Sequence, residues 1–173
     1  MPKARPVEKV VIETTAWVAL LDDEANRAEH VERVLLRAAA GEAQIYTSAL
    51  TITEITKGPK ADDPPLDEDQ AATFARFLEN EYVTLVSVDP VVAEKAKELR
   101  RAFHGLRTPD AIHVATGVVI GAGVLYTYDD DQLKLNGDER LDGMVIVEPP
   151  IEHQTDLGFG EAREQLPAMA PDD

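Results

Sequence analysis

The chain has 173 residues, of which 44% are hydrophobic, and this suits one compact domain with a core of its own. It has no cysteine, so disulfides and thiolate metal sites are excluded and a reducing cytoplasm is the expected setting. Its 33 acidic and 17 basic residues give a formal charge of −16. That charge argues against a protein that coats nucleic acid with a basic surface, but not against an enzyme that grips a phosphodiester through bound cations. No apolar run approaches the roughly 18 residues that span a membrane, so we expect no membrane association.

The first half of the chain alternates short apolar strands with helices. Apolar spacing and capping residues predict, in order, a strand at 9–12, a helix capped by Thr14 or Thr15, a helix at about 24–40, a strand at 44–47 and a helix that follows Ser48. Residues 58–67, with three prolines and three aspartates, predict a loop.

The second half repeats this alternation. The same signals predict a helix opened by Asp67, a strand at 83–88, a helix at about 92–103, a helix from Thr108-Pro109 to about Gly121, and strands at 124–127 and 144–147. Short strands alternating with helices predict an α/β fold with three layers, α/β/α, around a mostly parallel central sheet of about five strands. We expect a flexible N-terminus at residues 1–8, the domain at residues 9–148, and an acidic tail containing proline and glycine at residues 149–173.

Acidic residues lie at or near the ends of predicted strands. In a parallel α/β sheet, ligands bind outside the carboxyl ends of the strands. Glu13 directly follows the first predicted strand and Asp129 follows the fourth, while Glu54 and Asp110 lie in the helices at 48–58 and 108–121. Carboxylates are the ligands that Mg²⁺ and Mn²⁺ prefer, and two such ions can activate a water and stabilise the leaving oxygen of a phosphodiester.

Each of these acids also has a purely structural interpretation, which the sequence leaves open. Asp110 complements the dipole of the helix that it begins. Asp129 is suited to capping a helix or to closing a turn. Glu54 taken alone is better explained as a solvated helix residue. Glu13 is the most suggestive of the four, because the end of a strand is an unusual place for a charge without a role.

Four further side chains are candidates for accessory roles beside these acids. His113 lies one helical turn after Asp110 and is either a metal or phosphate contact or, as we favour, a core or supporting residue. Arg107 either touches a phosphate or pairs with an acid. Thr14 and Thr127 either orient carboxylates or cap helices.

Four segments together resemble the motifs of a known family. They lie at residues 11–21 (VIETTAWVALL), 47–55 (TSALTITEI), 106–116 (LRTPDAIHVAT) and 125–131 (LYTYDDD). In order and spacing they are similar to the motifs of a PIN domain of the VapC toxin type, and the segment at 106–116 is the most specific match. The resemblance covers roughly residues 9 to 148.

The resemblance implies a metal site on four acidic positions, which correspond here to Glu13, Glu54, Asp110 and Asp129. Asp131 is then an extra ligand or a residue that supports the ligands. The resemblance also implies Mg²⁺ or Mn²⁺ as the cofactor and a homodimeric endoribonuclease, the toxin of a type II toxin–antitoxin pair, that cleaves RNA through a metal-activated water.

A small antitoxin is the partner that this resemblance implies. We expect a basic or arginine-containing segment of it to reach the acidic cleft, because the chain carries a strong negative charge. An apolar stretch of the antitoxin is expected on the helices near Trp17 and Leu21. Trp17 itself is either partly exposed there or part of the core.

One position departs from the family pattern. The family has aspartate at the first acidic position, whereas this chain has Glu13, whose carboxylate lies one methylene further from the backbone. This keeps a second function open, that of a catalytically weak or inactive PIN module that binds protein or RNA. A receiver domain would need an acidic pair after the first strand, and a dinucleotide-binding fold would need a glycine-rich turn there; this chain has neither.

Overall fold

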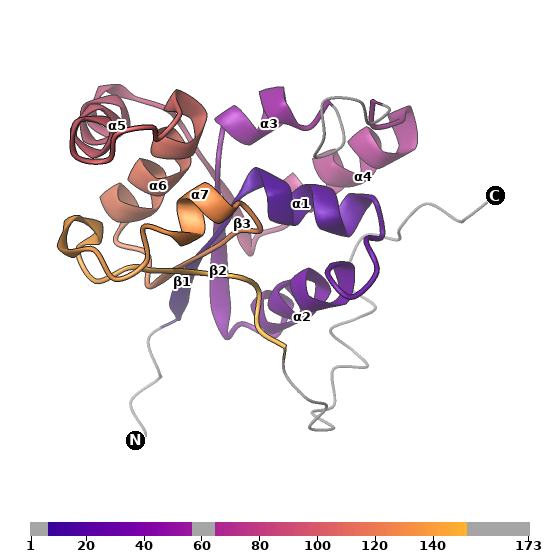
Figure 1. Ribbon diagram of the computed structural model, residues 1–173. Coiled ribbons are helices and arrows are strands. Elements are labelled where there is room, and N and C mark those ends of the chain that lie inside the picture. The colour runs from indigo at the N-terminus through magenta and orange to yellow at the C-terminus, as the bar shows by residue number, and fades with distance from the viewer. Residues whose placement is uncertain (1–6, 57–64, 152–173) are drawn as a thin grey trace, which may run out of the picture.

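The computed structural model describes residues 7–56 and 65–151, which form a five-stranded sheet between two layers of helices (Figure 1). Every strand pairing is parallel, and the strand order is β3-β2-β1-β4-β5. This confirms the three-layer α/β fold expected from the sequence. The strands are β1 (Glu8–Ile12), β2 (Ala43–Ser48), β3 (Val83–Val86), β4 (Val124–Tyr126) and β5 (Val145–Val147).

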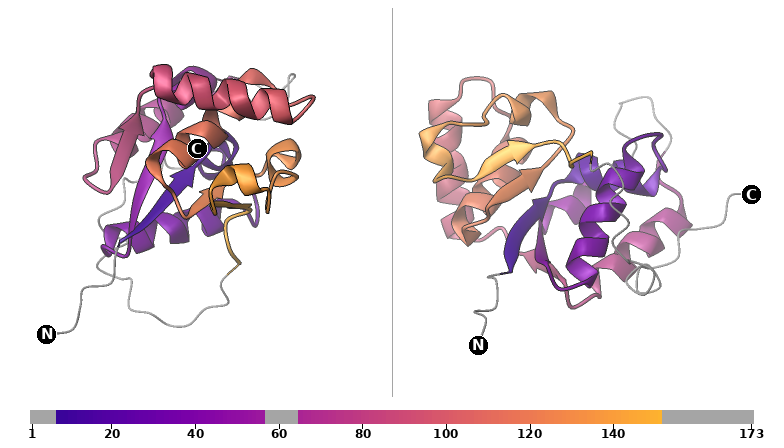
Figure 2. Two further views of the ribbon diagram at one scale, coloured as in Figure 1. Left: turned by 90° about the vertical axis from the view of Figure 1, so that its left-hand side faces the viewer. Right: turned by 90° about the horizontal axis from the view of Figure 1, so that it is seen from below.

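The helices form two groups, one on each face of the sheet (Figure 2). Helices α1, α2 and α4 pack on one face, and α5 and α6 pack together on the other. The short α3 follows β2 directly, and α7 and the 3₁₀ helix η1 lie between β4 and β5. The bounds are α1 (Thr14–Leu21), α2 (Ala28–Ala39), α3 (Leu50–Glu54), α4 (Glu68–Leu78), α5 (Pro90–Ala102), α6 (Thr108–Ile120), α7 (Asp130–Leu133) and η1 (Glu139–Leu141).

The central strand β1 divides the core in two. Val10 and Ile12 belong to the cluster that also contains Trp17, whereas Val11 belongs to the cluster on the other face, with Leu99 of α5. Successive side chains of a strand point to opposite faces, so an apolar run such as this one is buried on both sides of the sheet. This burial holds the carboxyl end of β1 in the middle of the molecule.

Helix α2 begins later than the sequence predicts. It starts at Ala28 rather than near Glu24, because Asp23 and Asn26 adopt positive φ angles of 48° and 65°. Residues in this left-handed conformation cannot continue a right-handed helix, so the chain turns before α2 begins. The predicted end of α6 is confirmed: Gly121 is its C-cap, with φ 66°.

The strands β3 and β4 are shorter than predicted, and two short helices between β4 and β5 were not predicted. β4 ends at Tyr126, so Thr127 is free to turn its side chain toward β1. Asp129 accepts hydrogen bonds from the backbone N–H groups of Asp131 and Gln132 and thereby caps α7. The capping interpretation of Asp129 is therefore confirmed.

Several sequence expectations fall outside the described residues. These are most of the N-terminal segment, most of the loop at 58–67, and the tail beyond residue 151. Within residues 7–56 and 65–151, no helix is long and apolar enough to cross a membrane.

Trp17 is part of the core, and the alternative that it is partly exposed is wrong. Its exposed fraction is 0%, and Leu21 beside it on α1 is also buried. The indole ring lies against Phe74 and Phe77, with centroids 5.3 and 5.6 Å away. Its Nε1–H donates a hydrogen bond to the Thr47 hydroxyl at 3.2 Å. These side chains therefore offer no surface for a partner.

We expect Trp17→Phe to lower the free energy of unfolding by about 1–2 kcal/mol, since it removes buried area and a buried hydrogen bond. Urea denaturation measures this, with Ile52→Ala as the control, because Ile52 is exposed and its truncation should change stability by less than about 0.5 kcal/mol. Trp17 is also the only tryptophan of the chain. Its fluorescence should be blue-shifted and resistant to iodide; red-shifted, readily quenched emission would contradict the burial.

Candidate metal centre

The four predicted acids lie around the carboxyl ends of adjacent strands. Glu13 follows β1, which lies between β2 and β4 in the sheet. Glu54 ends the short helix after β2, and Asp129 lies three residues after the end of β4. Asp110 lies in the first turn of α6, whose Arg107 contacts both it and Asp129. Contacts described below join all four residues into one network.

Glu13 is fixed in place by three hydrogen bonds. Its Oε2 accepts from the backbone N–H of Thr15 at 2.9 Å, from the Thr15 hydroxyl at 2.6 Å and from the Thr127 hydroxyl at 2.9 Å. Glu13 is thus the N-cap of α1, and the prediction that Thr14 or Thr15 caps this helix is wrong. A carboxylate side chain at the position before the helix satisfies the orphan backbone N–H that the threonines cannot reach.

The other oxygen of Glu13 has no such partner. Among the described residues no hydrogen bond reaches Oε1, which lies 3.9 Å from Nε2 of His113. The whole residue is only 3% exposed. A carboxylate oxygen that accepts no hydrogen bond from the protein keeps its lone pairs free, so this atom is suited to a bound cation.

Glu54 and His113 form a second part of the network. Oε2 of Glu54 lies 2.6 Å from Nε2 of His113 and accepts a hydrogen bond from the Thr14 hydroxyl, also at 2.6 Å. Burial raises the pKa of Glu54, but the contacts with His113 and Thr14 lower it by more, so its pKa lies below the usual range and the group is a carboxylate at neutral pH. Ligand atoms of Glu13, Glu54 and His113 all lie within 4.8 Å of one another.

Arg107 joins the remaining two acids. Its Nε and Nη2 donate to the two carboxylate oxygens of Asp110 at 2.8 and 3.2 Å, and Nη2 also donates to Asp129 at 3.3 Å. Burial raises the pKa of Asp110 and outweighs the lowering by Arg107. Of the two roles left open for Arg107, the structure shows the ion pair with acids. The Arg107 side chain is nonetheless 65% exposed, so its guanidinium can move away from the two aspartates without disturbing the fold.

Thr127 connects the two halves of the site. Its hydroxyl donates to Glu13 and accepts a hydrogen bond from the backbone N–H of Asp129 at 3.0 Å. Thr15 makes a parallel connection, because its hydroxyl accepts from the backbone N–H of Tyr128. This role of Thr15 was not predicted from the sequence. Its position two residues after the acid was the signal, since that residue faces the side chain of an N-cap.

Asp131 lies apart from this network. Its carboxylate accepts a hydrogen bond from Lys134 at 2.7 Å, and its side chain is largely exposed. Lys134 lowers the pKa of Asp131 through this contact. A direct ligand role for Asp131 would require that pair to open.

The residues present fit a divalent cation. Four carboxylates converge, two of them, Glu13 and Asp110, in buried residues. Oxygen-rich sites of this kind suit Mg²⁺ and Mn²⁺. Among the described residues, Arg107 and His113 are the only basic side chains that contact these four acids. A bound cation would therefore relieve the repulsion among the carboxylates.

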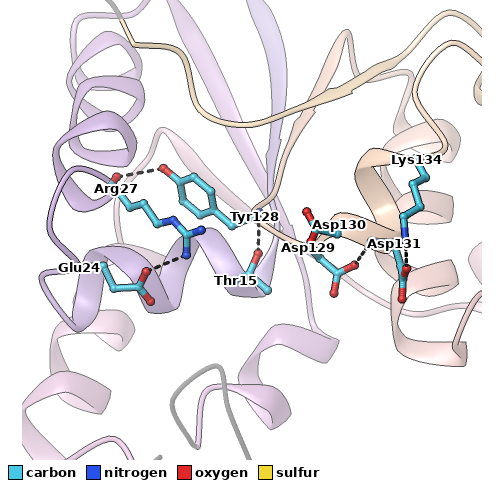
Figure 3. Close-up of a pocket in the computed structure, with 8 residues that line it drawn as sticks. All are labelled: Thr15, Glu24, Arg27, Tyr128, Asp129, Asp130, Asp131 and Lys134. Carbon is cyan, nitrogen blue, oxygen red and sulfur yellow. Dashed lines mark hydrogen bonds and ion pairs between the residues drawn. The ribbon is translucent and has the colours of Figure 1, made fainter.

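An open groove of about 400 Å³ continues from Asp129 along the surface (Figure 3). Arg27 lies over the Tyr128 ring, 4.6 Å from its centroid, and pairs with Glu24. Burial raises the pKa of Tyr128 to about 12, so the phenol keeps its proton and donates to the backbone carbonyl of Arg27. The lining comprises four acidic and two basic residues together with a threonine and a tyrosine: Thr15, Glu24, Arg27, Tyr128, Asp129, Asp130, Asp131 and Lys134.

The sequence model of the PIN domain family matches residues 10–138, which include all four acids and most of the sheet. The protein is a PIN-domain protein. No curated protein sequence matches this PIN-domain chain.

Solved structures of toxin–antitoxin systems share its fold. One is VapBC2 from Rickettsia felis bound to a DNA fragment from the promoter, with 14% identity and a TM-score of 0.57, covering 80% of this chain and 96% of that one. A toxin–antitoxin complex from Klebsiella pneumoniae has 20% identity and a TM-score of 0.56, covering 82% and 98%. VapC20 from Mycobacterium tuberculosis, a toxin that cleaves the sarcin–ricin loop, has 21% identity and a TM-score of 0.52, covering 79% and 96%.

The position of Arg107 in this PIN domain gives a test of the electrostatics of the site. We expect Arg107→Ala to raise the affinity for Mn²⁺ about fivefold, because a guanidinium on Asp110 and Asp129 repels a cation bound to the same oxygens. The effect is small because the guanidinium is largely in solvent, which screens its charge.

Isothermal titration with Mn²⁺ measures this affinity. Arg101→Ala is the matched control, since Arg101 is an exposed arginine of α5 outside the network. A fall in affinity on Arg107→Ala would mean that the arginine arranges the two aspartates for the metal rather than competing with it.

Proposed function

We propose that the protein is a metal-dependent endoribonuclease, the toxin of a type II toxin–antitoxin pair, active in the cytoplasm. One observation carries the proposal: hydrogen bonds and ion pairs join four carboxylates from four separate segments at the carboxyl edge of a PIN-domain sheet, and Glu13 among them keeps one oxygen without a donor from the described residues. The PIN-domain toxins with this fold support the class of enzyme.

Glu13, Glu54, Asp110 and Asp129 would hold Mg²⁺ or Mn²⁺. The bound cation supplies activation of a water and stabilisation of charge on the phosphate. The chain's own residues give the site its shape: Thr15 and Thr127 fix Glu13, while Thr14 and His113 hold Glu54. The chain has no cysteine and its sequence shows no evident Ser–His pair, so attack by water without a covalent enzyme intermediate is the expected route.

Cleavage of a mixed RNA pool by the purified chain tests the proposal. We expect fragments with Mg²⁺ or Mn²⁺ and none with a chelator. Intact RNA under all metal conditions, although the metal binds, would contradict the nuclease. That result would favour the alternative, a weak PIN module in protein or RNA binding, which the glutamate at position 13 keeps open.

We propose a small antitoxin as the partner, with a basic segment in the groove beside Asp129. Four acidic and two basic residues line that groove, so it keeps an excess of negative charge that attracts a positive chain. The expected apolar contact at Trp17 and Leu21 is abandoned, because both side chains are buried. Co-expression with the product of an adjacent small gene tests the pairing, and separate migration at low salt would contradict it. A homodimer is the proposed assembly of the toxin itself.

A further inference from the structure

We propose that His113 is a positioning residue of this site: its Nε2–H holds Glu54 in place for the metal, and the imidazole is not itself a ligand. The inference rests on the metal site of the proposed function. The alternative is that His113 joins Glu13 and Glu54 as a nitrogen ligand, since their ligand atoms lie within 4.8 Å of one another.

The contact with Glu54 decides where the imidazole proton lies. An ionised carboxylate only accepts hydrogen bonds, so an Nε2 that lies 2.6 Å from Oε2 of Glu54 must carry a proton. This holds whether the ring is neutral or charged. A nitrogen that carries a proton has no lone pair to give to a metal.

The surroundings of Nδ1 disfavour the tautomer in which the imidazole proton lies on Nδ1 instead of Nε2. Nδ1 of His113 is buried and has no hydrogen-bond partner among the described residues. If Nε2 bound a metal, the proton of the neutral ring would sit on Nδ1 and remain unpaired in a residue that is only 1% exposed. Histidines that ligate metals almost always donate their other N–H to an acceptor, and His113 has none.

Glu54 is the acid that most needs to be held. It is the last residue of the five-residue helix α3, and its side chain is 27% exposed. A long side chain at the end of a short helix is otherwise free to change rotamer. Thr14 and His113 both contact Oε2, which leaves Oε1 for the cation. Glu13, by contrast, is fixed by three hydrogen bonds of its own.

Two substitutions separate positioning from ligation. His113→Phe fills the buried space without a donor, and His113→Gln keeps an N–H at a similar reach from the backbone. We expect His113→Phe to weaken Mn²⁺ binding about 10- to 100-fold, the usual loss when a supporting contact is removed. His113→Gln should stay within about fivefold of the natural chain. Circular dichroism checks that both variants fold.

Electron–nuclear double resonance on Mn²⁺ bound to the natural chain needs no variant. We expect no directly coupled nitrogen. A coupled ¹⁴N signal, unchanged binding by His113→Phe, or an equal loss in both variants would each overturn the inference. If the natural chain fails to bind Mn²⁺, the inference and the proposed function fall together. If binding follows the expected pattern but RNA stays intact, the proposed function fails and the inference stands.

Discussion

Asp110→Asn is expected to weaken Mn²⁺ binding at least about a hundredfold and to reduce metal-dependent RNA cleavage to background. The substitution keeps the shape of the side chain but removes one of the four charges that would hold the cation. Arg107 bridges Asp110 and Asp129, and Asp110 is the more buried of these two aspartates. An amide carries no charge, so it cannot replace the attraction of an anionic ligand for the cation.

Loss of folding would not explain this result. Burial raises the pKa of Asp110, so the folded chain disfavours its charged form, and a neutral asparagine should leave stability unchanged or slightly increased. Arg107 loses a partner, but its guanidinium is mostly in water.

Calorimetric titration with Mn²⁺ and cleavage of a mixed RNA pool measure the two effects of Asp110→Asn. Asp69→Asn is the matched control: it removes the same charge from the exposed first turn of α4 and should leave both quantities unchanged. Equal Mn²⁺ binding by the natural chain and Asp110→Asn would remove Asp110 from the site.

Glu13→Asp is expected to raise metal-dependent cleavage by about tenfold or more. Aspartate is the residue that the resemblance to the family's first motif implies at this position. A shift of about 1 Å in a catalytic group can change a rate by on the order of a hundredfold. The fold should also tolerate Glu13→Asp, because Glu13 is the N-cap of α1 and aspartate is among the favoured N-cap residues. The backbone N–H of Thr15 therefore keeps an acceptor.

The hydrogen bonds around Glu13 also define the contrary outcome. Thr15 and Thr127 donate to an oxygen placed by the longer side chain. If the site is built around that length, Glu13→Asp will lower cleavage, and Glu13 is then a working ligand of a relaxed site. The measurement compares RNA cleavage by both forms at equal concentration and saturating Mn²⁺. A Glu13→Gln variant is the control for charge, since it keeps the length and should bind Mn²⁺ weakly.

The sequence by itself determined the fold class. The apolar runs of β1 and β4 are short and are buried on both faces of the sheet. This pattern, and the alternation of strands with amphipathic helices, already predict a parallel sheet between helical layers. The ends of two helices were also predictable, because the residues that set them lie next to those ends in the sequence. Asp67 caps α4 in a capping box, and Gly121 ends α6 with a left-handed residue.

Predictions from neighbouring residues were wrong where a side chain contacts a distant part of the chain. Thr14 looks like a helix cap in the sequence, but in the fold its hydroxyl donates to Glu54, forty residues away. The cap is Glu13, a residue type with little local preference for that place. No spacing rule predicts the contact between Thr14 and Glu54, because it depends on α3 lying beside the start of α1.

The four acids were identifiable from their positions after strands and from the resemblance to a family, but their connections were not. Only the tertiary structure shows that Arg107 bridges Asp110 and Asp129, and that the imidazole of His113 meets Glu54. A hydrogen bond is decided within a few tenths of an ångström, and packing of elements far apart in the chain sets that distance. The sequence determined which chemical groups this protein has at the edge of its sheet, and the packing of α3 against α6 and the start of α1 decided which of them touch.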